Sequence, residues 1–131
     1  MTAGVAEAAG VGFYSTYGWH PLAVAAAAAN LRYWGKHRDR ILANVADQAD
    51  YFRTRLDGMK FAEPASVRVI GLAIGVEFGD GTDYAAKLGD RCREAGLLVS
   101  TEEDNLLTMY PPLTIDREVA RAGLDLLEGC L

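Results

Sequence analysis

Cysteine and histidine are scarce in this sequence, with two of each among 131 residues. Cys92 and Cys130 come without a secretory context, so free thiols in a reducing cytoplasm are expected rather than a disulfide framework. The two cysteines and two histidines are scattered along the chain, and no pair of them has the spacing of zinc ligands. The sequence therefore predicts neither a metal centre nor a disulfide-stabilised secreted fold.

Basic residues are also fewer than acidic ones, and the formal net charge is −5. No stripe of Lys and Arg is present, so a nucleic-acid or membrane-surface role has no electrostatic support. Residues 22–31 form an apolar stretch of about half the length that crosses a bilayer. The N-terminal segment 1–12 has no basic residue ahead of its apolar ones, unlike a signal peptide. We expect a cytoplasmic protein.

Motifs for a self-contained catalytic site are missing, because the chain has no GxSxG, Walker A or GxGxxG pattern. The only lysines, Lys36, Lys60 and Lys87, fall on predicted polar faces or loops, where no desolvated amine suited to Schiff-base chemistry is expected. Residues 102–104 form an acidic turn, interpreted as solvated, with cation binding or acid–base chemistry as the alternative. No catalytic residue is assigned.

Helical patterns are present in the first half of the chain. Pro21 suits the first position of a helix, where its missing N–H costs nothing. That helix is predicted over residues 21–34, ending at Gly35. Asp39 can cap a second helix over residues 40–56, in which apolar residues recur at steps of three and four.

Strand patterns follow in the second half. Large apolar residues alternate with small or polar ones over residues 72–78, which predicts a strand. LLVST and LLTMY are shorter strands joined by the polar connection EEDN. Helices are predicted over residues 84–94 and after Asp116. The order of elements predicts an α+β two-layer domain with a mainly antiparallel sheet and flanking helices, the long helices covering one face.

The turn ahead of the first helix is the most informative stretch. Ser15 and Thr16 place hydroxyl groups beside the N–H groups of a helix N-terminus, where the helix dipole and unpaired donors favour an anion such as phosphate. The alternative is that Ser15, Thr16 or His20 simply caps the helix.

Four segments resemble class III (subgroup II) aminotransferases, in the order in which the family has them. YSTYGWHPLAVAAAAANLRYW is similar to a Thr-Phe/Tyr-Gly-Gly-Asn-Pro turn and its alanine-rich helix, and VRVIGLAIGVEF to an Arg-Gly-x-Gly-Leu-x-x-Gly-x-Glu strand. REAGLLVS is similar to an Arg-x-x-Gly-Leu-Leu element, and LTMYPPLTIDREVARAGLDLLEGCL to the closing Pro-Pro-Leu-x-Ile segment and C-terminal helix. Together they cover the chain from about residue 12 to its end.

The resemblance implies a pyridoxal-phosphate (PLP) dependent enzyme of the aspartate-aminotransferase fold type, usually a homodimer. It implies that this chain corresponds to the C-terminal third, the small domain. In that scheme residues 1–20 are an irregular lead-in with the phosphate-contact turn. Residues 21–57 are two helices that join and start the small domain, and residues 58–131 are its remainder.

Site residues follow by resemblance. Thr16, with Ser15 beside it, matches the threonine that contacts the cofactor phosphate of the neighbouring subunit. Thr108 stands where many members carry an arginine that binds the substrate carboxylate, so a bidentate guanidinium is missing there. Trp19-His20 and Val69 also depart from the family pattern.

The family's Schiff-base lysine belongs to an upstream large domain, and no lysine here matches it. The chain alone is therefore predicted to be inactive, to need a large PLP-binding domain or upstream segment, and to self-associate. The alternative is a non-catalytic dimerising or binding module with the same small-domain fold.

Overall fold

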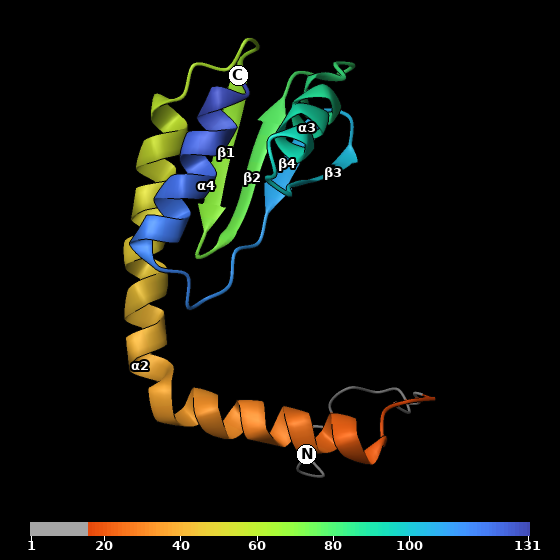
Figure 1. Cartoon of the computed structure of the whole chain (residues 1–131), viewed down its shortest axis with the longest axis vertical. Coiled ribbons are helices and arrows are strands. Elements are labelled where there is room, and N and C mark those ends of the chain that lie inside the picture. Colours follow the sequence, from red (N-terminus) through yellow and green to blue (C-terminus); the bar gives the residue numbers. More distant parts are fainter. Residues whose placement is uncertain (1–15) are drawn as a thin grey trace. The chain divides into compact units, whose positions relative to one another are not determined.

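The computed structural model describes residues 16–131 (Figure 1). The chain divides into two compact units, Met1–Arg38 and Asp39–Leu131. The elements in chain order are α2 (Pro21–Gly58), β1 (Ala65–Ile70), β2 (Ala73–Phe78), α3 (Tyr84–Glu94), β3 (Ser100–Glu103), β4 (Leu106–Met109) and α4 (Arg117–Gly129). Within residues 16–131, none of the helices combines the length and the apolar character that a bilayer span requires.

Helix α2 corrects one prediction. The sequence predicts two helices within residues 21–57, separated at Gly35, whereas the structure has a single helical segment of 38 residues. A lone glycine lowers helix stability by only about 1 kcal/mol relative to alanine, which strong helix formers on both sides offset. No proline follows Gly35 before Pro64, so nothing forces the helix to stop. The boundary between the two compact units lies within this helix, after Arg38.

The second unit contains one four-stranded sheet in the order β1-β2-β4-β3, and each neighbouring pair is antiparallel. This confirms the predicted α+β class with an antiparallel sheet. The predicted hairpin near the C-terminus is also confirmed, although its turn is shorter than expected. Glu103 pairs with Leu106, so the acidic residues belong partly to β3 and only Asp104 and Asn105 remain as the turn.

Strand β1 is not recognisable as a separate element from the sequence. Ala65–Ile70 pairs with Ala73–Phe78, and the two strands are joined by Gly71 and Leu72. Gly71 has a φ of +57°, which a two-residue hairpin turn of type II′ requires at its first position and which glycine adopts without strain. The single strand predicted over residues 72–78 is therefore the second half of a hairpin.

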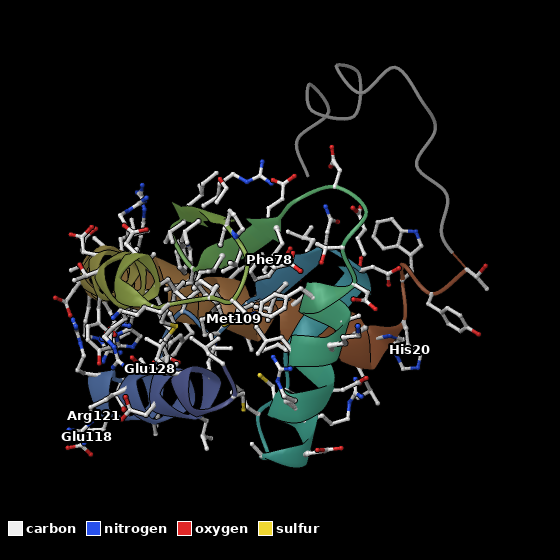
Figure 2. The ribbon with its side chains drawn as sticks, turned by 90° about the horizontal axis from the view of Figure 1, so that it is seen from above. His20, Phe78, Met109, Glu118, Arg121 and Glu128 are labelled. Carbon is white, nitrogen blue, oxygen red and sulfur yellow. The ribbon has the colours of Figure 1, made fainter. Side chains whose placement is uncertain are left out.

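The sheet has one buried and one open face. Ile74, Val76 and Phe78 alternate with more exposed residues along β2, and Val76 pairs with Val67 and Leu107 on its neighbours. Helices α3 and α4 and the second half of α2 complete this core with Phe52, Leu56, Leu88, Cys92, Ala120, Leu124 and Leu127. Figure 2 shows Phe78 and Met109 among the side chains between the strands and the helices. The open face carries the Arg68–Glu77 ion pair, at 2.8 Å.

Helix α4 lies beside the second half of α2 (Figure 1). Arg55 of α2 donates to Asp125 at 2.7 Å and to Glu128 at 3.0 Å, and the hydrogen bond to Asp125 is the main cause that raises the pKa of Arg55. Asp116 caps α4 by accepting a hydrogen bond from the Val119 N–H at 2.9 Å, as predicted. The Arg55 hydrogen bonds hold α4 against the second half of α2.

Candidate functional site

Thr16 lies in an exposed turn, residues 16–19, that leads directly into α2. The His20 N–H donates to the Tyr17 carbonyl at 3.1 Å, and the Val24 N–H donates to the His20 carbonyl at 3.0 Å. His20 therefore accepts the first helical hydrogen bond and occupies the N-cap position. Ser15, the other predicted cofactor residue, lies outside the described residues.

The donors at this turn suit an anion. Pro21 has no N–H, and the N–H groups of Leu22 and Ala23 precede the first residue that can bond back into the helix. No acidic residue lies in the first turn of α2, so nothing there repels a negative charge at the positive end of the helix dipole. The exposed hydroxyl of Thr16 adds a further donor. The residues present thus fit a phosphate group chemically.

Thr108 lies in β4 and belongs to the second compact unit, whereas Thr16 belongs to the first. It is half-buried, pairs with Gly75 on β2 and with Ser100 on β3, and donates a long hydrogen bond of 3.5 Å to the Ser100 carbonyl. Thr108 lines a groove of about 450 Å³. The groove's other lining residues are Phe52, Leu97, Leu98, Val99, Ser100, Met109, Tyr110, Pro111, Ile115, Val119, Ala120, Gly123 and Leu124.

The lining of this groove is uncharged. Its polar side chains are the hydroxyl groups of Ser100, Thr108 and Tyr110, and the rest are apolar. A wall of this kind can hold an apolar group and orient it with weak hydrogen bonds, but it offers no guanidinium for a bidentate bond to a carboxylate. Sequence reasoning did not assign the wall formed by residues 97–100 to a site, although the family-like segment REAGLLVS contains it.

Asn44 holds the segment that follows the Pro111-Pro112 pair. Its side-chain amide donates to the Leu113 carbonyl at 2.9 Å and to the Ile115 carbonyl at 3.1 Å. Ile115 is a lining residue of the groove, so one α2 side chain fixes the shape of its rim. No local pattern signals this role, because it depends on a contact between residues about seventy positions apart.

Asn44→Ala is expected to lower the free energy of unfolding of the second unit by about 1–2 kcal/mol, because two side-chain hydrogen bonds are lost. It should also speed hydrogen exchange at the Ile115 amide, which donates to the Pro112 carbonyl at 2.9 Å. Urea unfolding and amide exchange measure the two effects. Asn30→Ala, at an exposed position of the same helix, serves as the matched control and should leave both unchanged or slightly raise stability. Equal effects of the two variants would contradict the assigned role.

The other sequence candidates are exposed. All three lysines, Lys36, Lys60 and Lys87, are exposed, and Lys87 pairs with Asp83 at 2.8 Å. That hydrogen bond is the main reason why the pKa of Asp83 lies below its usual value. The acidic residues 102–104 are exposed as well. In the described part of the chain no group of three or more His, Cys, Asp or Glu side chains is arranged to hold a metal ion.

Known proteins with similar sequences include several aminotransferases. The acetylornithine aminotransferase of Methanosarcina mazei is 36% identical over 115 residues, which cover 87% of this chain and 28% of the relative. The ornithine aminotransferase of Bacillus subtilis is 32% identical over 104 residues, which cover 79% of this chain and 25% of the relative. The chain thus spans less than a third of the length of these relatives.

Solved structures agree in fold. A transaminase with L-alanine superimposes with a TM-score of 0.75 at 27% identity, over 98% of this chain and 32% of that one. A phospholyase from Arthrobacter, in complex with phosphoethanolamine, has a TM-score of 0.75 at 31% identity, over 99% of this chain and 33% of that one. Residues 2–131 match the family described as aminotransferase class-III. The chain therefore belongs to the class III aminotransferase family.

Proposed function

We propose that this chain is the small-domain part of a PLP-dependent class III aminotransferase, which transfers an amino group between an amino acid or amine and a 2-oxo acid. Residues 1–20 carry the phosphate-contact turn, 21–57 join and start the small domain, and 58–131 complete it. The observation that supports the proposal is the exposed position of Thr16 in the turn that leads into the N-terminus of α2, in a chain of this family.

Thr16 donates a hydrogen bond to the phosphate of PLP across a dimer interface, and the positive end of α2 stabilises the same charge. Thr108 and the uncharged groove residues form a wall on the substrate side. When bound, PLP supplies the electron sink for the chemistry at the amino-bearing carbon. The chain's own part is to position the phosphate and to shape the substrate space, because no catalytic residue is assigned to it.

The lysine that carries the cofactor belongs to a large domain, either upstream in the same polypeptide or in a separate one. Lys36, Lys60 and Lys87 are all exposed, and none lies in a hydrophobic pocket of the kind that activates a Schiff-base lysine. The 131-residue chain alone is therefore expected not to catalyse transamination.

Mixing the purified chain with PLP tests this part of the proposal. We expect no visible absorption band of a lysine-bound cofactor, and no specific lysine adduct after borohydride reduction and peptide mapping, until a lysine-bearing large domain is supplied. A stoichiometric adduct on one of the three lysines would overturn the assignment. The DNA directly upstream of the coding sequence provides a second check, since an in-frame continuation with a lysine-bearing strand would support it.

The role of Thr16 is tested in the complex with the large domain. Thr16→Val should weaken PLP binding by about 10- to 100-fold, the size of one hydrogen bond to a charged group. Thr16→Ser keeps the hydroxyl and should bind nearly as the parent does, and Thr114→Val, at an exposed loop position, should have no effect. A stable oligomer indifferent to Thr16→Val and to PLP would instead support the non-catalytic module.

A further inference from the structure

The two cysteines of this chain, distant in sequence, are neighbours in the fold. Cys92 lies on α3 and Cys130 is the C-cap residue of α4. Cys92 belongs to the buried core cluster, and Cys130 is a partly buried residue packed against that cluster. A hydrogen bond joins the two segments, because the side-chain Nε–H of Arg91, the residue before Cys92, donates to the Cys130 carbonyl at 2.8 Å. Both are free thiols in the structure.

The two thiols differ in their surroundings. Cys92 is completely buried within the core, whereas Cys130 is half-buried at its edge. Burial raises the pKa of the Cys92 thiol to about 12, so this group stays protonated and is protected from direct attack. Cys130 is the less buried of the two, so an oxidant in solution is expected to react with it first. The pair therefore consists of an accessible first thiol and a buried second one.

We propose that Cys92 and Cys130 form a reversible intramolecular disulfide when the protein meets a peroxide. In the first step the Cys130 sulfur attacks the peroxide, becomes a sulfenic acid and releases one water molecule. In the second step the Cys92 sulfur attacks the sulfenic sulfur, its proton leaves with the hydroxyl group as a second water, and the S–S bond forms. Both thiols are oxidised by one electron each, and the peroxide takes up the two electrons.

The bond would link the end of α4 covalently to α3. The last helix is otherwise held by side-chain contacts to α2 and the core, including the Arg55 ion pairs. A cross-link between residues 92 and 130 closes a loop that includes β3, β4 and α4, and such a loop restricts the unfolded chain. The oxidised protein is therefore expected to unfold at a higher urea concentration than the reduced one.

The test treats the reduced, folded chain with hydrogen peroxide, denatures it, alkylates the remaining thiols and maps tryptic peptides by mass. Trypsin cleaves after Arg93 and Arg121, so the two cysteines stay in one product only if they are bridged. We expect the Cys92–Cys130 linked peptide to become the main product, both alkylated peptides to disappear, and dithiothreitol to restore them.

Two variants define the order of the steps. In Cys92→Ala, dimedone should trap a sulfenic acid at Cys130, whereas in Cys130→Ser the remaining Cys92 should stay unoxidised and fully alkylatable after unfolding. Because Cys130 is at the edge of the core, its serine variant is expected to fold, which circular dichroism checks. Dimers joined through Cys130, or a sulfinic acid at Cys130 with Cys92 still free, would overturn the proposal.

Discussion

Leu127→Ala is expected to lower the free energy of unfolding of the second unit by about 3–5 kcal/mol. Leu127 is on α4, has 0% of its surface exposed, and belongs to the core that α4 shares with α2, α3 and the sheet. Truncation removes apolar contacts and leaves a cavity that the surrounding elements refill only partly. Since domains are stable by only about 5–15 kcal/mol, this loss is a large fraction of the total.

Leu126→Ala is the matched control for this prediction. The two residues are neighbours on the same helix, but Leu126 is 41% exposed. Its truncation should cost less than about 1 kcal/mol, because much of its side chain contacts water in the folded protein as it does in the unfolded one. Urea unfolding followed by circular dichroism measures both. Equal losses would show that α4 does not bury the face that carries Leu127.

Helices with local signals could be predicted from the sequence. Asp116 caps α4 with its side chain, and Gly96, with a φ of +87°, follows α3 at the position where glycine ends a helix. Such signals need only the residues within one helical turn, so they act the same way in any fold. For the same reason the position of Thr16, ahead of a helix that begins at Pro21, follows from the neighbouring residues alone.

The β1–β2 hairpin could not be predicted because its first strand lacks a clear alternation. β1 is an edge strand in which Val69 is buried and Ile70, the next residue, is 80% exposed, so apolar residues occupy both faces. Gly35 led to the opposite error, because it predicted a helix end where the structure has a continuous helix. A glycine between two helical patterns favours a break, but intrinsic propensity is weak and the surrounding helix overrides it.

The groove around Thr108 could not be predicted from the sequence, for a different reason. Its lining residues come from α2, from residues 97–100, from β4, from the loop that follows β4, and from α4. Only the tertiary fold brings these segments together. The sequence identifies Thr108 and the LLVS segment separately, each by resemblance to a family motif. The pairing of Ser100 with Thr108 across two strands is what joins them into one wall.

Gly89→Ala is expected to destabilise the second unit, although alanine is the better helix former. Gly89 is buried on α3, and a Cβ there would lie 2.7 Å from Cγ2 and 3.3 Å from Oγ1 of Thr101 on β3. Real carbon atoms do not approach so closely, so the Thr101 side chain or the two elements must shift, at a cost of about 1–3 kcal/mol. The gain in helix propensity, about 1 kcal/mol, recovers only part of it.

The sign of this effect should reverse when Thr101 is shortened. In a Thr101→Ala background Cγ2 and Oγ1 are absent, and the nearest remaining atom, the Cβ of residue 101, is 3.6 Å from the new methyl group, an ordinary contact. Gly89→Ala should then stabilise the protein by up to about 1 kcal/mol through helix propensity. The double-mutant cycle should give a coupling of about 2 kcal/mol, as residues in direct contact do. Urea unfolding of the four proteins measures it. Additive effects would mean that α3 does not pack on β3 at this point, and the placement of Cys92 beside the end of α4 would then lose support as well.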